Sequence, residues 1–167
     1  LLNQKFGIGT LLDAFKKIDD PDLKLVLCGS GDAEDLIQEK MKSDNRIVYL
    51  GRIDRKKVLA LQRNATLLVN PRQNNEDFTK FSFPSKNLEY LSSGVPVITY
   101  KLDGIPDEYD DYIFYPKDNS TEALYDAING IVSMTPEEQQ QKREKAKNFV
   151  FENKNKNKQA QRIFEFI

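Results

Sequence analysis

Hydrophobic positions along the chain alternate between two periodicities. From residue 7 to residue 18, apolar side chains recur every three to four positions, which predicts a helix. Residues 23–28 then form a short, nearly continuous apolar run between Asp22 and Gly29. Such a run is typical of a strand that is buried on both faces of a sheet. The first thirty residues therefore predict a helix followed by a buried strand.

The same alternation continues along the rest of the chain. Short apolar runs predict further strands near residues 46–50, 66–70, 95–99 and 112–115. Helical spacing predicts helices near residues 36–41, 56–63, 85–93, 121–132 and 156–167, and one more that begins after Thr135. Gly94 is expected to end the helix before it. Thr135, followed by Pro136 and two glutamates, is a helix-start signature. We expect residues 153–158 to form a solvated connector.

Alternating strands and helices predict an α/β fold, a Rossmann-like doubly wound parallel sheet covered on both faces. We expect residues 1–167 to form one such domain, with C-terminal helices over 136–167. Ligands of these open sheets bind at the carboxyl ends of the strands. The loops to inspect are therefore those that follow Cys28, Leu50, Asn70 and Thr99.

Composition narrows the function classes. The formal net charge of −1 gives no global field toward nucleic acid, so we expect no nucleic-acid partner. The chain has no histidine, which removes histidine-based catalysis, and we expect no metal site. Its single cysteine, Cys28, is expected to be a buried, inert thiol in a reducing compartment. No apolar stretch approaches the roughly 20 residues that span a bilayer. We therefore expect a cytoplasmic protein.

The loop after the first strand contains Gly29, Ser30 and Gly31. Glycines allow a ligand to approach the backbone, and free N–H groups at a helix start attract phosphate. A dinucleotide fingerprint would need a third glycine at position 34, where the chain has Glu34. The alternative is a tight turn in which Asp32 caps the next helix.

The loop after the second strand is basic. Arg52 adds positive charge at the ligand edge, as do the three basic residues at 55–57, and Ile53 offers an apolar contact to a base. Alternatively, Asp54 caps the next helix and the basic side chains are solvated. The following loop, residues 70–80, is long and polar, which is typical of functional or mobile loops.

The segment from Pro84 to Glu89 carries most of the chemistry. Ser85 is expected to cap the helix that follows, and Lys86 adds a cation to its N-terminus, which suits a diphosphate. Glu89 lies one turn further on, where a carboxylate can accept hydrogen bonds from both vicinal hydroxyls of a ribose. The competing interpretation is that the apolar neighbours pack while Glu89 faces water.

Residues 88–98, Leu-Glu-Tyr-Leu-Ser-Ser-Gly-Val-Pro-Val-Ile, resemble the Leu-Glu-Ala-Met-Ala-x-Gly-x-Pro-Val-Ile signature of family 4 glycosyltransferases. These enzymes have the GT-B fold. Blocks at 11–15, 25–31, 47–51, 65–71 and 104–109 resemble family blocks in the family's order. The resemblance covers nearly the whole chain. It implies the C-terminal, nucleotide-sugar-binding half of such an enzyme, without its first strand and its N-terminal acceptor domain.

The resemblance also implies a set of donor-binding residues. Glycines of the first loop and Ser30 would lie near the diphosphate or sugar, and Ser85 with Lys86 at the phosphates. Glu89 would hold the ribose, and Arg52 with Ile53 would border the base. The Ser-Phe-Pro-Ser-Lys motif replaces the usual Gly-Phe-Gly-Leu-Pro. The donor-binding set is Gly29, Ser30, Gly31, Arg52, Ile53, Ser82, Phe83, Ser85, Lys86 and Glu89.

One position departs from the family. Family members usually have two glutamates separated by seven intervening residues, the second on the ribose and the first near the donor sugar. Glu89 matches the second, but the first would fall at Phe81. A carboxylate role at that position cannot be carried over, so no catalytic residue is assigned.

By resemblance, the complete enzyme transfers a hexosyl group, with retention, from a UDP- or GDP-linked donor and without a cofactor. Its acceptor would be a cell-surface polysaccharide or lipid-linked glycan, bound through the N-terminal domain. A lipid-linked acceptor would bring peripheral contact with the inner face of the membrane. The fragment alone is expected to be inactive. Two alternatives are a non-catalytic nucleotide-binding or regulatory domain and a doubly wound module that binds a partner but no nucleotide.

Overall fold

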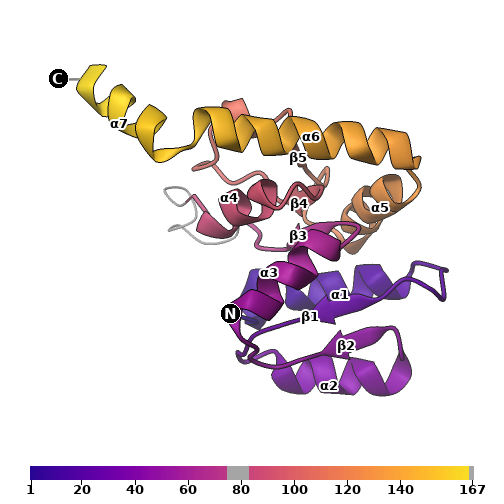
Figure 1. Ribbon diagram of the computed structural model, residues 1–167. Coiled ribbons are helices and arrows are strands. Elements are labelled where there is room, and N and C mark those ends of the chain that lie inside the picture. The colour runs from indigo at the N-terminus through magenta and orange to yellow at the C-terminus, as the bar shows by residue number, and fades with distance from the viewer. Residues whose placement is uncertain (75–82, 166–167) are drawn as a thin grey trace.

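The computed structural model describes residues 1–74 and 83–165 (Figure 1). Five strands alternate with seven α-helices in this part of the chain. The strands are β1 (Leu25–Leu27), β2 (Ile47–Tyr49), β3 (Leu68–Asn70), β4 (Val97–Thr99) and β5 (Ile113–Phe114). The helices are α1 (Ile8–Lys16), α2 (Glu34–Ser43), α3 (Arg55–Asn64), α4 (Ser85–Ser92), α5 (Thr121–Val132), α6 (Pro136–Asn153) and α7 (Lys156–Glu165). Each strand and α-helix predicted from the sequence is present.

All the strand pairs are parallel, but they form two sheets. β1 pairs with β2, with Leu25 opposite Ile47. β3 pairs with β4, and β4 pairs with β5. The predicted parallel α/β arrangement is confirmed, whereas one continuous sheet is not seen in the described residues. Figure 1 shows the two sheets above one another, with α2 below the first and α6 above the second.

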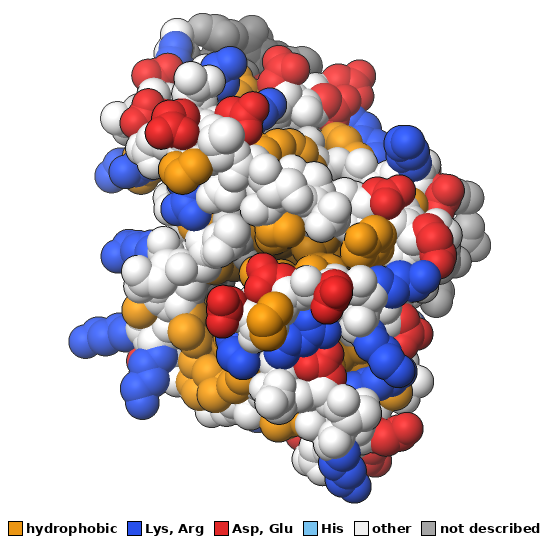
Figure 2. All heavy atoms as spheres, turned by 90° about the vertical axis from the view of Figure 1, so that its right-hand side faces the viewer, with side chains coloured by type: hydrophobic (Ala, Val, Ile, Leu, Met, Phe, Trp, Pro, Cys, Tyr) orange, Lys and Arg blue, Asp and Glu red, His pale blue; other side chains and the backbone are white. Residues whose placement is uncertain are grey.

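An apolar groove separates the two sheets. Residues of both β1 and β3 line it, and it is part of a hollow of about 1210 Å³ that continues to the carboxyl ends of the strands. The predicted burial of β1 on both faces is therefore wrong, because Val26 in its middle is 41% exposed. Figure 2 views the molecule from the side of the strands' amino ends, where hydrophobic side chains show between the upper and lower halves of the molecule.

Packing between helices joins the two halves. α1 packs on α5, and a buried cluster extends from α1 and α2 through β1 and β2 to the inner face of α5. Leu12 and Leu124 are fully buried in this cluster. A second cluster, which includes Leu91 and Phe149, packs α4 against α6. The contact between α4 and α6 holds the helix that carries the Ser-Phe-Pro-Ser-Lys motif.

Two predicted helix ends are confirmed. Gly94 follows α4 with a φ of 74°, a left-handed conformation in which glycine carries no steric cost. At the start of α6, the Thr135 hydroxyl accepts the Glu138 N–H, and the Glu138 carboxylate accepts the Thr135 N–H. This reciprocal pair is a capping box.

The predicted connector over 153–158 is wrong in extent. α6 runs to Asn153 and α7 begins at Lys156, so only two residues separate the helices. The Lys154 side chain is largely buried rather than solvated: it pairs with Glu108 and lies over the rings of Tyr109 and Phe149. The Lys154 ammonium has an acidic partner and its four-carbon chain packs on aromatic rings. A run of lysines and asparagines does not predict these contacts.

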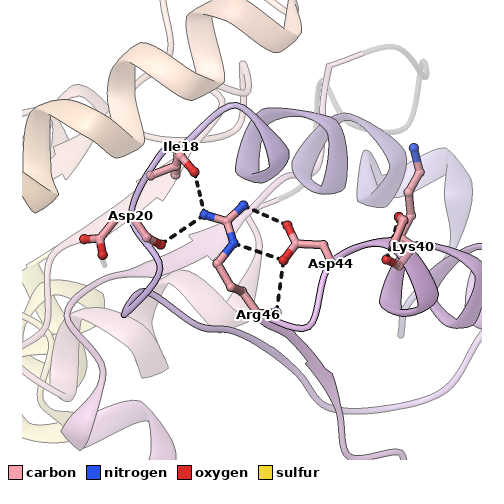
Figure 3. A network of polar contacts seen from close by, with 6 residues as sticks. Ile18, Asp20, Lys40, Asp44 and Arg46 are labelled. Atoms are coloured by element: carbon pink, nitrogen blue, oxygen red, sulfur yellow. Dashed lines mark hydrogen bonds and ion pairs between the residues drawn. The ribbon is translucent and has the colours of Figure 1, made fainter.

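Arg46 fixes the amino-terminal end of the first sheet (Figure 3). Its guanidinium donates to both carboxylate oxygens of Asp44 and to the backbone carbonyls of Ile18 and Asp20. It also lies over the Phe15 ring, 4.9 Å from the centroid. One side chain thus ties the end of α1, the loop before β1 and the start of β2 together.

Candidate functional site

The carboxyl ends of β1 and β3 and the loop after β2 border the hollow of about 1210 Å³. Two of its lining residues, Cys28 and Asn70, lie where β1 and β3 end. The predicted residues that line it are Gly29, Arg52, Ile53, Phe83, Ser85, Lys86 and Glu89. The structure therefore brings together residues from three loops that are far apart in the sequence.

Helix α4 presents its N-terminus to this hollow. Pro84 precedes its first turn with a φ of −66°, and no side chain caps the helix there. The prediction that Ser85 caps α4 is wrong, because Ser85 is already the first helical residue. Lys86 follows it and is exposed. A helix start without a side-chain cap, with a cation beside it, favours an anion.

Glu89 lies one turn further along α4, with 31% of its side chain exposed. Its Oε1 accepts a hydrogen bond from Gln62 Nε2 at 2.8 Å, and its Oε2 accepts one from Arg55 Nη2 at 3.3 Å. Both donors come from α3, so the carboxylate is held between two helices. The alternative is right that the apolar neighbours Leu91 and Val95 pack, but Glu89 does not simply face water, because both of its carboxylate oxygens accept hydrogen bonds.

Two neutral groups, Tyr90 and Cys28, line the hollow together with the carboxylate. Tyr90 is mostly buried, and this burial, with the charge of Glu89 beside it, raises the pKa of Tyr90 to about 12. Burial also raises the pKa of the Cys28 thiol, which lines the same hollow. The sequence predicted a buried Cys28, whereas the residue is only partly buried. Its thiol stays protonated near neutral pH.

The first glycine loop is tightly packed. A side chain on Gly31 would meet the Leu2 carbonyl oxygen at 2.4 Å, and Gly29 has a φ of 127°. The Gly29 N–H already donates to the Gly51 carbonyl, and the Gly31 N–H donates to Glu34 Oε1. This second bond lowers the pKa of Glu34. Both glycines are thus explained by packing and turn geometry; Gly29 also borders the hollow, whereas Ser30 and Gly31 do not line it.

Asp32 does not cap α2. Its Oδ1 accepts the N–H of Gln4 at 2.6 Å, and α2 begins without a side-chain cap. The prediction of a capping role for Asp32 is therefore wrong. Its carboxylate ties the loop after β1 to the first turn of the chain instead.

In the basic loop after β2, Asp54 caps the next helix, as the second of the two interpretations predicted. Asp54 Oδ1 accepts the Lys57 N–H at 3.0 Å and caps α3. Lys56 and Lys57 are exposed, whereas Arg52 bends toward the glycine loop and donates from Nε to the Ser30 hydroxyl at 2.6 Å. Ser30 therefore reaches the site through Arg52. Ile53 is partly buried and borders the hollow.

Ser82, the first residue of the Ser-Phe-Pro-Ser-Lys motif, lies outside the described residues, as does Phe81 before it. Phe83 is described, and its ring packs 5.0 Å from that of Tyr109 in a tilted arrangement. The aromatic contact anchors the start of α4 to the second buried cluster. Phe83 thus combines a structural contact with a place on the wall of the hollow.

Sequence reasoning missed Gln62. It lies four residues after Val58, and the spacing places both on one face of α3. The sequence did contain one indication of a role for this residue, namely a glutamine on the inner face of a predicted helix. Buried polar side chains usually have a specific partner. That partner, Glu89, lies 27 residues away and could not be read from the pattern.

A second, smaller hollow of about 660 Å³ lies at the opposite edge, beside Lys17, Lys24 and Arg46. It is basic, but Arg46 is committed to the network of Figure 3. In the described part of the chain, no cluster of three or more acidic, cysteine or histidine side chains is placed to hold a metal ion. None of the described helices is long and apolar enough to cross a membrane.

Parallel strands covered by helices, with a hollow at their carboxyl ends, define a doubly wound α/β domain. The chain belongs to the family of glycosyl transferases group 1, whose model matches residues 2–162. The predicted membership of a glycosyltransferase family is therefore confirmed. No curated protein matches the sequence.

Three solved structures share the fold. The C-terminal domain of a glycosyl transferase group 1 family protein (LpcC) from Francisella tularensis has a TM-score of 0.71 and 18% identity, covering 92% of this chain and 82% of that one. The catalytic domain of cholesterol-α-glucosyltransferase from Helicobacter pylori has a TM-score of 0.69 and 17% identity, covering 89% and 91%. AviGT4, a glycosyltransferase involved in avilamycin A biosynthesis, has a TM-score of 0.58 and 13% identity, covering 86% and 42%. The fold is that of the C-terminal domain of a GT-B glycosyltransferase.

Proposed function

We propose that this glycosyltransferase domain binds a nucleoside-diphosphate sugar, UDP- or GDP-linked, in the hollow at the carboxyl ends of its strands. The observation that carries the proposal is that Lys86 and Glu89, both on α4, line the same hollow. The helix start and the Lys86 ammonium suit a diphosphate, and the carboxylate of Glu89 suits a ribose. Arg52 and Ile53 line the same hollow and are suited to the base.

The proposed reaction transfers the sugar to an acceptor hydroxyl with retention. The bond between the anomeric carbon and the diphosphate oxygen breaks, and its electron pair stays on the diphosphate. The acceptor oxygen forms the new bond to the anomeric carbon, and its proton passes to the departing diphosphate oxygen. Negative charge therefore grows on the departing diphosphate, where the dipole of α4 and the Lys86 ammonium oppose it.

No residue of the described site is assigned to the acceptor or to a catalytic carboxylate. We propose that an N-terminal domain binds the acceptor, a polysaccharide or lipid-linked glycan, and that residues 1–167 alone do not transfer sugar. A lipid-linked acceptor would place the full enzyme at the inner, cytoplasmic face of the membrane. Phe81, at the position of the family's first glutamate, leaves the group near the donor sugar unassigned.

Calorimetric titration of UDP and GDP into residues 1–167 and into a Glu89→Ala variant tests the site. Loss of hydrogen bonds to a charged group is expected to weaken nucleotide binding by about 1.5–3 kcal/mol. Glu39→Ala, which removes an exposed glutamate on α2, is the matched control and should bind as the original protein does. Equal affinity of the Glu89→Ala variant and the original protein, with both folded, would remove Glu89 from the site.

A further inference from the structure

Gln62 is an unusual residue for the inner face of α3. It is only 7% exposed, and it is one of three buried polar or charged residues in the described part of the chain. Its Nε2 donates to Glu89 Oε1 at 2.8 Å, and the two residues line the same hollow. Gln62 is the one residue of α3 that is buried, and a buried amide calls for a specific role.

The orientation of this amide is fixed by its partner. An ionised carboxylate only accepts hydrogen bonds, so the nitrogen end of Gln62 must face Glu89. The Gln62 Oε1 atom then points elsewhere, and it is buried without a hydrogen-bond donor among the described residues. Leaving a buried acceptor unpaired is unfavourable. The amide therefore makes a poor general stabiliser of the core, and its polar contact is directed to Glu89.

The carboxylate of Glu89 keeps capacity for a ligand. A carboxylate has about four lone-pair positions, and the two hydrogen bonds from Gln62 and Arg55 leave about two. Gln62 holds the buried side of the carboxylate, whereas Arg55 is 79% exposed and approaches from the solvent side. A glutamate that is fixed in this way has lost its rotational freedom before the ligand arrives, so binding need not order it.

We propose that Gln62 is a positioning residue that orients Glu89 to accept both vicinal hydroxyls of a ribose, and that it thereby sets the preference of the site for a ribonucleotide. The inference rests on the proposed nucleotide-sugar function. It adds a residue on a different helix, 27 positions away in the sequence, to the recognition of that ribose.

The test compares UDP with 2′,3′-dideoxy-UDP, and GDP with its dideoxy analogue, by calorimetry on residues 1–167. The original protein should prefer the ribonucleotide about tenfold or more, the scale of a hydrogen bond to a charged group. Gln62→Met keeps the length of the side chain and removes the amide. Its preference should fall to about threefold or less while its affinity for the dideoxy analogue stays unchanged, because a group that contacts only Glu89 acts only through the hydroxyls.

Two further variants make the result specific. Arg63→Ala removes an exposed side chain from the last turn of α3 and should keep the full preference. Gln62→Leu replaces Gln62→Met if the latter does not fold, which thermal unfolding reports. If neither variant folds, Gln62 is a structural residue and the proposal is overturned.

The remaining outcomes separate this proposal from the function on which it rests. Retention of the tenfold preference in folded Gln62→Met overturns the positioning role and leaves the nucleotide site intact. Nucleotide binding by the original protein without any preference for the ribonucleotide removes Glu89 from the ribose, and the role of Gln62 with it. Absence of binding to UDP, GDP and their analogues contradicts the proposed function itself.

Discussion

Glu89 shows how a single carboxylate can be both structural and available. Gln62 and Arg55 hold it from α3, yet it stays on the wall of the hollow. The arrangement explains how α4 can present a fixed acceptor to a ligand while its first turn is open to an anion. Lys86 and Glu89 are three positions apart, so the same helix face can serve both ends of a nucleoside diphosphate.

Asp44 gives a residue-scale prediction about pH. Its hydrogen bonds with Arg46 hold the pKa of the carboxyl below its ordinary value of about 3.9. A lowered folded-state pKa stabilises the protein above the ordinary value, and the contribution is lost as the pH falls through the lower one. Asp44→Asn is therefore expected to cost about 1.5–3 kcal/mol at pH 7, and progressively less below about pH 4.

Urea unfolding between pH 7 and pH 3 measures this difference. Asp111→Asn, at an exposed aspartate, is the control and should leave the unfolding free energy nearly unchanged at every pH. If the loss of unfolding free energy in Asp44→Asn does not shrink as the pH falls, the charge of Asp44 is not the cause of that loss.

At the residue scale, the sequence predicted which residues gather at the carboxyl edge of the strands but not which side chains they contact. It placed Arg52, Ile53, Ser85, Lys86 and Glu89 near one another, because parallel strands end at one edge of a sheet. It could not give the partners of those residues. The caps expected from Ser85 and Asp32 failed because a cap depends on the local backbone and on neighbours such as Gln4, which lies 28 residues from Asp32.

At the scale of elements, the alternating periodicities predicted the strands and helices well. Their boundaries moved by a few residues, as in β1, which is Leu25–Leu27 rather than 23–28. The split into two sheets was not visible in the pattern, because periodicity reports which side chains are apolar and not which strands pair. The exposure of Val26 follows from that split.

The groove between β1 and β3 leads to a prediction about a further strand. The Leu25 N–H donates to Arg46 and the Leu68 N–H donates to Pro96, so the N–H groups of Val26 and Val69 point to the opposite edges, along the groove. We propose that an extended apolar segment from outside residues 1–167 lies there and completes one parallel sheet, as the resemblance led us to expect.

Hydrogen exchange tests the proposed strand. The amides of Val26 and Val69 should exchange rapidly in residues 1–167 and become protected in a longer protein that includes the segment. The Leu25 and Leu68 amides, which already have partners, serve as internal controls and should be protected in both. Unchanged exchange of Val26 and Val69 in the longer protein would contradict the proposal.

At the scale of the whole molecule, charge does not select the ligand. The formal net charge is −1, and the face in Figure 2 carries both signs without a dominant patch. The proposed recognition therefore rests on the local constellation at the carboxyl edge, where a helix start, a cation and a held carboxylate share one hollow.

The most direct measurement is a chemical-shift titration of residues 1–167 with UDP, GDP and ADP. The account predicts that at least one of these nucleotides shifts the amide signals of Ser85 to Glu89 together with those of Arg52 and Ile53, while signals beside Arg46 at the opposite edge stay in place. A protein whose Ser85 to Glu89 signals do not move with any of the three nucleotides would contradict it.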